Sequence, residues 1–266
     1  AAGLGEPVSN LGEEKQGHYR ITGFFDLYCT PGPHMTAIFD GLQRRHGHFL
    51  VRETGWPKLD SLNLTDQRAE RKKSLGLDPD KPVLLYAPTF SPKLTSAPVL
   101  FSEIRALQSR GYQWICKFHS LEKKALISRY QALESPAFQI AKTDDILPLM
   151  EAADILITDT SSVAYEFLLL DRPIITYRAR ARQDKGLDIT TPDDLEGAIV
   201  RSLLDPGEFS PVRHEILEEL HPYRDGQSSQ RVVETVQDVL AGGELETLRP
   251  KPANRFRKWQ LQRMFP

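Results

Sequence analysis

The sequence lacks the features that mark several large classes of protein. Its 266 residues contain no run of about 18 uncharged apolar residues and no signal-peptide pattern at the start, so neither a membrane span nor an export signal is expected. The two cysteines, Cys29 and Cys116, have no CxxC spacing, which disfavours a zinc site or a disulfide framework and favours reduced, buried thiols. HExxH, GxGxxG, Walker A and GxSxG patterns are also missing, which weakens assignment as a protease, dinucleotide-binding protein, P-loop protein or α/β-hydrolase.

What is present is the composition of an ordinary globular protein, with 40% hydrophobic and 26% charged residues. The net charge of −2 hides an asymmetry, because residues 249–266 contain six Lys and Arg and no acid, which leaves −8 on the residues before them. Aromatic residues are interleaved with these cations, a composition that suits an anionic membrane surface. A solvated helix packed back on the fold explains the segment equally well, and nucleic acid is not expected, because nothing else in the chain supports it.

Strand and helix patterns alternate along most of the chain. Apolar runs predict strands at 25–29, 47–53, 81–88, 114–118 and 138–140, and at both ends of the stretch 154–177. Helical patterns lie at 33–45, 66–74, 100–110, 121–132, 146–152, 192–204, 211–220 and 228–241. Strands separated by such helices predict an α/β fold with a Rossmann-like parallel sheet and helices on both faces.

The stretch 154–177 is the most informative, because it reads as one βαβ unit with a hydroxyl-rich turn after its first strand. Asp159 ends that strand, and Thr160, Ser161 and Ser162 enter the helix. Unpaired backbone N–H groups and the positive end of the helix dipole at this point suit a phosphate. The same residue types are also preferred N-caps of helices that bind nothing.

Polar residues also follow two other predicted strands. Thr89 comes after the strand at 81–88. Lys117 and His119 lie at the end of the strand at 114–118, and side-chain alternation puts both on the same side of the sheet. Ligands of parallel sheets bind beyond the carboxyl ends of the strands, so these residues and the hydroxyl turn are expected to line one crevice. There a cation and an imidazole could steady phosphate charge and give a proton to a leaving oxygen, although a strand-end histidine can simply bond a backbone carbonyl.

A second hydroxyl-rich helix entry occurs at 223–229. Gly226 permits a turn, Ser228 or Ser229 can cap the helix that follows, and Arg224 supplies a charge for a further wall of the crevice. The acidic pairs at 144–145 and 193–194 precede helices and complement their dipoles, so no metal site is predicted from them.

Taken in order, these segments resemble the CDP-glycerol glycerophosphotransferase family, the teichoic-acid polymerases and primases of GT-B architecture. The resemblance covers roughly residues 20–240, and its most specific part is the hydroxyl turn with its helix and second strand. The pieces that carry it are Thr54–Asp60, Leu85–Phe90, Lys117–His119, Ile157–Ile175 and Tyr223–Gly226.

The resemblance implies a transferase that moves a polyol phosphate, glycerol phosphate first, from a CDP-activated donor to a polymer or lipid-linked hydroxyl in cell-surface polymer synthesis, releasing CMP. It implies that residues 1–60 are a remnant of the acceptor-side domain with the hinge, that 61–243 bind the donor, and that 244–266 form a basic-aromatic tail. His119 becomes the catalytic residue, at the diphosphate or leaving group. The donor contacts become Thr89, Lys117, Asp159, Thr160, Ser161, Ser162, Arg224, Asp225 and Ser228.

The chain departs from the family pattern in places. Ser120 replaces the proline that often follows the strand-end histidine, and Phe90-Ser91 replaces a Trp-Arg pair. The acceptor-side His-Gly loop is not recognisable, since 2–6 resembles only its remainder and His18 lies downstream; the sequence start looks like a loop cut from something longer.

Two alternatives stay open. One is a nucleotide-sugar glycosyltransferase or UDP-N-acetylglucosamine 2-epimerase-like enzyme, and the other a noncatalytic nucleotide-binding or membrane-docking fragment. No cofactor is predicted, and Mg²⁺ is not indicated. The expected location is cytoplasmic, peripheral on the inner face of the cytoplasmic membrane.

Overall fold

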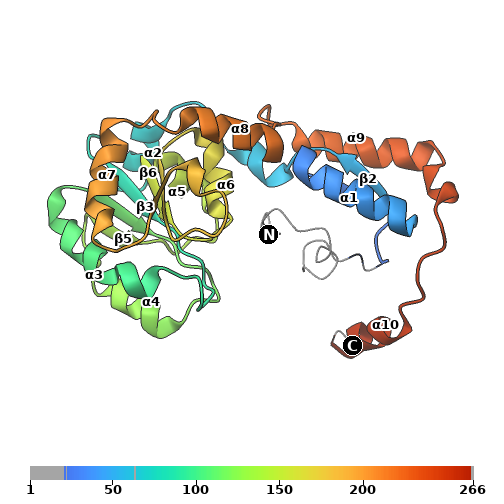
Figure 1. The fold of residues 1–266 in the computed structure, drawn as a ribbon, viewed down its shortest axis with the longest axis horizontal. Helices are drawn as coiled ribbons and strands as arrows, with labels where there is room; N and C mark the ends of the chain where they lie inside the picture. Colours follow the sequence, from blue (N-terminus) through green and yellow to red (C-terminus); the bar gives the residue numbers. More distant parts are fainter. Residues whose placement is uncertain (1–20, 22, 63, 265–266) are drawn as a thin grey trace. The chain divides into compact units, whose positions relative to one another are not determined.

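The computed structural model describes residues 21, 23–62 and 64–264, and within them the chain forms two compact units (Figure 1). The first unit is Ser61–Glu218, and the second combines the described residues up to Asp60 with those from Glu219 onward. The second unit is therefore built from two segments that are distant in sequence. The predicted division put residues 61–243 together, whereas residues 219–243 lie with the second unit.

The first unit is organised around a six-stranded parallel sheet in the order β5-β4-β3-β6-β7-β8. Its strands are β3 (Val83–Tyr86), β4 (Gln113–Cys116), β5 (Phe138–Ile140), β6 (Ile155–Thr158), β7 (Ile174–Tyr177) and β8 (Leu187–Ile189). All residues of β3, β4, β6 and β7 are buried, as expected for strands covered on both faces. The predicted Rossmann-like parallel sheet is confirmed.

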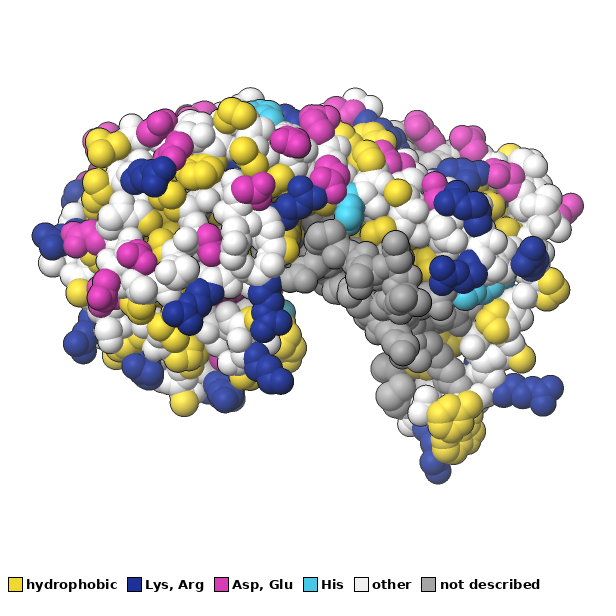
Figure 2. All heavy atoms as spheres, in the orientation of Figure 1, with side chains coloured by type: hydrophobic (Ala, Val, Ile, Leu, Met, Phe, Trp, Pro, Cys, Tyr) yellow, Lys and Arg dark blue, Asp and Glu magenta, His cyan; other side chains and the backbone are white. Residues whose placement is uncertain are grey.

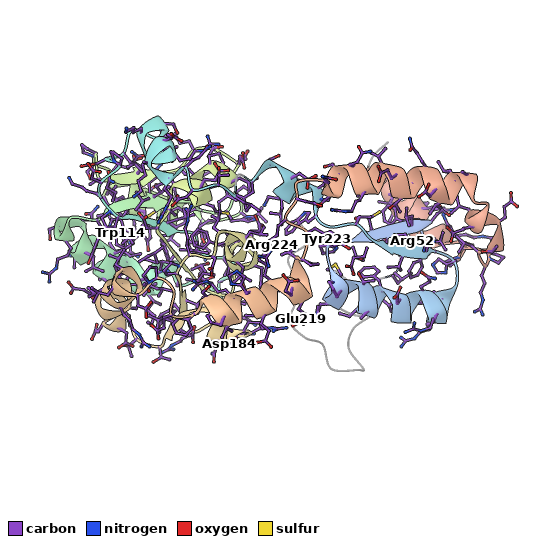
Figure 3. The ribbon with its side chains drawn as sticks, turned by 90° about the horizontal axis from the view of Figure 1, so that it is seen from above. Arg52, Trp114, Asp184, Glu219, Tyr223 and Arg224 are labelled. Atoms are coloured by element: carbon purple, nitrogen blue, oxygen red, sulfur yellow. The ribbon has the colours of Figure 1, made fainter. Side chains whose placement is uncertain are left out.

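Helices cover both faces of this sheet (Figure 1). They are α2 (Arg68–Ser74), α3 (Ala97–Leu107), α4 (Lys124–Gln131), α5 (Leu147–Ala152), α6 (Val163–Phe167) and α7 (Asp194–Leu204), followed by α8 (Ser210–Leu220). On one face, Leu100 of α3, Tyr130 of α4 and Ile199 of α7 pack with alternate strand side chains in a single apolar core. Trp114 of β4 lies inside that core, and Figure 3 shows it surrounded by side chains of the first unit.

Two elements of the first unit differ from the predictions. Strand β8 was not predicted, because three residues carry too little of the apolar alternation by which strands are recognised. Gly186 precedes it, and a Cβ there would lie 1.9 Å from the carbonyl oxygen of Ile174, so only glycine permits this approach. The helix expected between the hydroxyl turn and the second strand of this unit is the five-residue α6, continued by the 3₁₀ helix η4 (Leu168–Leu170).

The second unit has a smaller sheet, in which β1 (Leu27–Thr30) and β2 (Leu50–Glu53) pair in parallel. Its other elements are α1 (Pro33–His46), η2 (Pro57–Ser61), α9 (Ser228–Ala241), η6 (Glu244–Thr247) and α10 (Arg255–Met264). Phe39 and Leu42 of α1 pack on Phe49 and on Val51 of β2 to form the core. Cys116 is buried as predicted, whereas Cys29 is exposed.

Candidate functional site

The candidate site of the first unit lies at the carboxyl edge of the sheet. The chain runs from β3 outward to β4 and β5, and then returns to place β6 on the other side of β3, so the strand order reverses between β3 and β6. In open α/β sheets, ligands bind outside the strand ends at such a reversal. Thr89 follows β3, His119 follows β4 and Ser161 follows β6, and these three strands are direct neighbours. The predicted convergence of these strand ends on one edge is therefore observed.

Asp159 is the structural centre of this edge. One carboxylate oxygen accepts a hydrogen bond from the backbone N–H of Thr89 at 2.8 Å, and the other accepts from the N–H and hydroxyl of Ser96 at 2.8 and 2.9 Å. The side chain is 1% exposed, and burial raises the pKa of Asp159 to about 6. The Ser96 hydroxyl also bonds the phenol of Tyr86 at 2.8 Å. Asp159 thus fixes the chain that follows β3 onto the end of β6.

The hydroxyl turn after β6 presents Thr160, Ser161 and Ser162, each partly exposed. Thr158, the last residue of β6, donates its hydroxyl to the carbonyl of Ala87 at 2.7 Å, which ties this turn to the end of β3. The helix that follows this turn, α6, has only five residues, so its dipole is smaller than that of a longer helix. The hydroxyl and backbone groups of the turn therefore matter more for binding an anion than the helix dipole does.

Arg180 was missed by the sequence analysis. It follows β7, the neighbour of β6, and its backbone N–H donates to the hydroxyl of Thr160 at 3.4 Å, so the segment after β7 lies against the hydroxyl turn. Its side chain is exposed and adds a cation to this edge. The available signal was position alone, because Arg180 comes three residues after the end of a predicted strand.

Strand β4 ends at Cys116 and not at residue 118 as predicted, so Lys117 and His119 follow the strand, with Phe118 buried between them. The Lys117 ammonium donates to the carbonyl of Phe118 at 3.3 Å. His119 is exposed, and its Nδ1 accepts the backbone N–H of Leu121 at 3.1 Å, so the neutral ring carries its proton on Nε2 and presents a donor. The ring packs on Phe90, with centroids 4.3 Å apart and planes inclined by 31°. Phe90 thus holds the imidazole at the sheet edge.

The remaining predicted residues belong to the second unit. Asp225 is exposed, pairs with Arg231 and accepts the backbone N–H of Gln227 at 3.1 Å. The bond to Arg231, and to a lesser degree that to Gln227, lowers the pKa of Asp225, although desolvation opposes the shift. Ser228 is 2% exposed, and its side chain lies against Gly55. The donor contacts of Asp225, Ser228 and the half-buried Arg224 stay a prediction.

The predicted cap of α9 is wrong. Neither Ser228 nor Ser229 caps the helix; the carboxylate of Asp60 instead accepts their backbone N–H groups at 3.0 and 2.6 Å. Asp60 lies in η2, 168 residues earlier in the sequence, and such a distant partner leaves no local pattern. Nearby, the phenol of Tyr223 donates to Glu53 at 2.9 Å, and Figure 3 shows Tyr223 within this unit.

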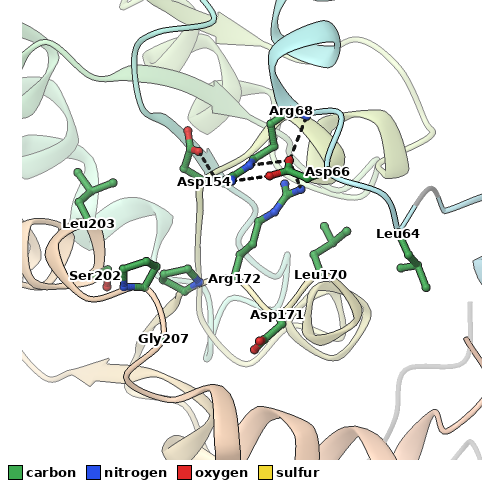
Figure 4. A pocket seen from close by; sticks show the side chains of 12 residues that line it. Leu64, Asp66, Arg68, Asp154, Leu170, Asp171, Arg172, Ser202, Leu203 and Gly207 are labelled. Atoms are coloured by element: carbon green, nitrogen blue, oxygen red, sulfur yellow. Dashed lines mark hydrogen bonds and ion pairs between the residues drawn. The ribbon is translucent and has the colours of Figure 1, made fainter.

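A pocket of about 440 Å³ lies at the opposite, amino edge of the first unit's sheet (Figure 4). Its charged residues are paired with protein groups: Arg68 bonds Asp66 and Asp154. Arg172 donates to the carbonyls of Glu151 and Ala153 at 2.8 Å, at the end of α5, and burial lowers the pKa of Arg172 to about 10. None of the predicted donor-binding residues lines this pocket, and its charged groups serve to join helices to the sheet.

No metal site is indicated among the described residues, since no three of their His, Cys, Asp and Glu side chains form a group that could hold an ion. The predicted positions at 2–6 and His18 lie outside the described residues.

Comparison with protein families matches residues 4–238 to the model described as CDP-glycerol:poly(glycerophosphate) glycerophosphotransferase. Among curated proteins, a teichoic acid glycerol-phosphate transferase of Staphylococcus aureus is 26% identical over 255 residues, covering 86% of this chain and 64% of that protein. A teichoic acid poly(glycerol phosphate) polymerase of Bacillus spizizenii is 28% identical over 183 residues, covering 64% of this chain and 45% of that protein. The chain thus spans about half the length of these relatives.

Solved structures resemble the fold. The wall teichoic acid polymerase TagF, in its H548A form, superposes with a TM-score of 0.65 at 21% identity, covering 84% of this chain and 60% of that one. The MnaA–UDP co-structure of S. aureus gives a TM-score of 0.56 at 15% identity, covering 85% and 63%. At these identities the likeness concerns the fold, which is that of GT-B proteins.

Proposed function

The chain belongs to the CDP-glycerol:poly(glycerophosphate) glycerophosphotransferase family, and we propose that it transfers glycerol phosphate from CDP-glycerol to a hydroxyl acceptor. In this reaction the acceptor oxygen attacks the β-phosphorus, the bond from that phosphorus to the bridging oxygen breaks, and CMP leaves. The observation that supports the proposal is that Thr89, His119 and Ser161 follow three neighbouring parallel strands. Hydroxyl, imidazole and backbone N–H groups at one sheet edge suit the binding of a diphosphate.

His119 is the proposed catalytic residue. Since Nδ1 accepts the N–H of Leu121, the Nε2–H group can donate to the diphosphate oxygen on which negative charge develops as the β-phosphorus bond breaks. Lys117 and Arg180 add positive charge to the same edge, and charge stabilisation with positioning is most of what phosphoryl transfer requires. Lys117 follows β4 and Arg180 follows β7, the strands on either side of the β3–β6 pair.

The hydroxyl turn is the proposed phosphate cradle. Thr160, Ser161 and Ser162 are partly exposed and can donate to phosphate oxygens. Asp159 acts indirectly in this proposal, since both of its carboxylate oxygens are occupied by Thr89 and Ser96, and it holds the strand ends at a fixed spacing. A rigid spacing matters because a displacement of about 1 Å can cost roughly 100-fold in rate.

The acceptor and location are also proposals. We infer a polymer or lipid-linked hydroxyl as acceptor and a peripheral location on the inner face of the cytoplasmic membrane, supported by the polymer-building names of the relatives and by the basic segment 249–266. No helix among the described residues is long and apolar enough to cross a bilayer. Residues up to about 60 are proposed to belong to the acceptor side.

The decisive experiment measures CMP release from CDP-glycerol by the unaltered protein and by His119→Ala. Loss of the Nε2–H donor should lower the rate about 100-fold or more, the usual contribution of a positioned proton donor, while the exposed position of His119 leaves the fold intact. His214→Ala, which removes an exposed histidine from α8, is the matched control and should keep full activity. Equal background rates in all three proteins would instead indicate a noncatalytic nucleotide-binding module.

A further inference from the structure

Helix α10 presents large apolar side chains to solvent. Phe256 is 69% exposed, Trp259 49% and Leu261 37%, although residues of these types usually lie in a core. Phe256 and Trp259 stand one turn apart and stack, with ring centroids 5.8 Å apart. Figure 2 shows hydrophobic side chains (yellow) beside Lys and Arg side chains (dark blue) in the region of α10. The helix therefore exposes an aromatic pair that nothing in its own described surroundings covers.

Cations surround this aromatic pair. The guanidinium of Arg263 lies over the Trp259 ring, 4.6 Å from its centroid, and Arg255 and Lys258 are exposed on the same helix. Residues 249–266 contain no acid, so no carboxylate of this segment neutralises them. The helix thus combines positive charge with apolar rings, and each ring has one face against a cation or another ring.

The segment before the helix is tied to the body of the second unit. The N–H of Arg249 donates to the carbonyl of Gly47 at 2.8 Å, and the Lys251 ammonium pairs with Asp26 at 2.6 Å. Asn254, with φ of 50°, turns the chain, and its carbonyl accepts the N–H of Lys258 in the first turn of α10. The helix therefore starts from a fixed point rather than from a free linker.

We propose that α10 docks this protein on an anionic lipid bilayer. Tryptophan and other aromatic rings favour the boundary between headgroups and hydrocarbon, while Lys and Arg are attracted to acidic headgroups. Ten residues of helix measure about 15 Å, half of the hydrocarbon thickness, so α10 lies on the surface and does not span. The proposal rests on the peripheral location inferred above and assigns it to α10, whereas the transferase reaction is tested separately.

Lipid explains this surface better than a nucleic acid does. Proteins that bind single strands splay aromatic rings so that bases stack on them, whereas Phe256 and Trp259 stack on each other. Leu261 is exposed as well, and an aliphatic side chain gains from hydrocarbon but offers no ring for a base to stack on. An acidic nucleic acid is therefore the competing outcome in the test.

The test is sedimentation of the whole protein with vesicles of phosphatidylcholine, with or without 30 mol per cent phosphatidylglycerol as an experimental choice on the order of natural anionic content. The unaltered protein should bind the anionic vesicles and should bind the neutral ones far more weakly. The triple variant Arg255→Gln, Lys258→Gln, Arg263→Gln should lose roughly 100-fold in affinity, at about fivefold per cation. The double variant Phe256→Ser, Trp259→Ser should also lose most of its binding.

A matched control separates α10 from overall charge. Arg105→Gln, Lys123→Gln, Lys124→Gln removes three exposed cations from the first unit and should bind within about twofold of the unaltered protein, because those residues lie outside the docking helix. Binding should also shift the Trp259 emission to the blue, measured as the difference between the unaltered protein and Trp259→Phe.

Four results would overturn the proposal. They are failure of the unaltered protein to sediment with anionic vesicles, equal binding to neutral vesicles, an equal loss in the control triple variant, and unchanged Trp259 emission on bound vesicles. A parallel experiment at the same salt concentration replaces the vesicles with a single-stranded oligonucleotide. Binding of the oligonucleotide through α10, without binding of vesicles, would assign the helix to nucleic acid. Failure of docking would remove the support that residues 249–266 give to a membrane location, whereas the transferase reaction is tested independently by CMP release.

Discussion

Asp159 shows how one residue can join two parts of a sheet edge through its hydrogen bonds. The family resemblance implied a donor contact for Asp159, and that contact stays a prediction. Its contacts with Thr89 and Ser96 join the chain that follows β3 to the end of β6. A buried carboxylate of this kind costs free energy when ionised unless hydrogen bonds compensate it, and three donors point at Asp159.

The raised pKa of Asp159 predicts a pH effect on stability. Burial raises the pKa to about 6 from 3.8, so the folded state holds the proton more tightly than the unfolded state does. This contribution to the free energy of unfolding is fully present below about pH 4 and is lost as the pH rises through 6, an effect of about 3 kcal/mol. Asp159→Asn removes the titration, so unfolding by urea at pH 4 to 7 should show a smaller decrease with pH in the variant.

The readout should be local to the first unit. Trp114 is fully buried there, and replacing Trp56 and Trp259 by Phe in both proteins makes its fluorescence the probe of unfolding. Identical pH dependence in the two proteins would mean that Asp159 titrates at an ordinary value.

The turn residues Asp171 and Arg172 have structural contacts that the sequence does not indicate. They form part of the motif that carries the family resemblance, yet both bind protein groups. Asp171 accepts Arg213 at 2.8 Å and Ser210 at 2.6 Å, which holds α8, while Arg172 bonds the carbonyls at the end of α5. This part of the motif maintains the βαβ unit, and the hydroxyl turn is the part available to a ligand.

At the scale of elements, α9 depends on a cap from outside its own sequence. Hydrogen bonds from Ser229 and Ser228 outweigh partial burial and lower the pKa of Asp60, so the capping carboxylate is charged at neutral pH. Its position at the helix N-terminus also matches the sign of the helix dipole. The cap joins η2 to α9, and so links the two sequence segments that form the second unit.

Removal of the Asp60 cap should destabilise the second unit by a predictable amount. Asp60→Ala should lower the free energy of unfolding of the second unit by about 1 kcal/mol, as for other N-cap losses, and should speed amide hydrogen exchange in the first turn of α9. Asp60→Asn keeps an acceptor oxygen and should lose less. Unchanged exchange at Ser228 and Ser229 in the alanine variant would show that the cap contributes nothing.

The elements themselves were largely accessible from sequence. Helices α1 and α9 were predicted to within one residue, because their apolar periodicity continues for several turns, and the buried strands were predicted within a few residues of their ends. Strand β8 and the break after α6 were not, since short elements are set by tertiary contacts such as the approach of Gly186 to Ile174. The distant cap by Asp60 was missed for the same reason.

The site was predictable to the extent that it follows from strand ends. Parallel strands bring their carboxyl ends to one edge, so Thr89, His119 and Ser161 could be grouped before any coordinates. Arg180 could not be singled out, because its place beside the hydroxyl turn depends on how the segment after β7 bends. The hydrogen bonds of Asp159 to Thr89 and Ser96 join distant segments and could not be read from the sequence.

At the scale of the whole molecule, the chain divides into two units, and one of them is built from two segments that are distant in sequence. The segment from Glu219 onward joins the unit that contains β1 and β2, because packing and not sequence order decides membership. The family match runs from residue 4 to 238 and so includes segments of both units. The family relationship therefore concerns the pair of units and not the larger sheet alone.

The measurement that tests the central claim most directly is a calorimetric titration of the protein with CDP-glycerol, CDP-ribitol and UDP-N-acetylglucosamine. A CDP-polyol should bind most tightly, and Ser161→Ala with Ser162→Ala should weaken that binding about tenfold or more through loss of two hydroxyl donors to phosphate. Tighter binding of the UDP-sugar than of either CDP-polyol, or full affinity in the double serine variant, would contradict a glycerol phosphate donor held at the carboxyl edge of β3 and β6.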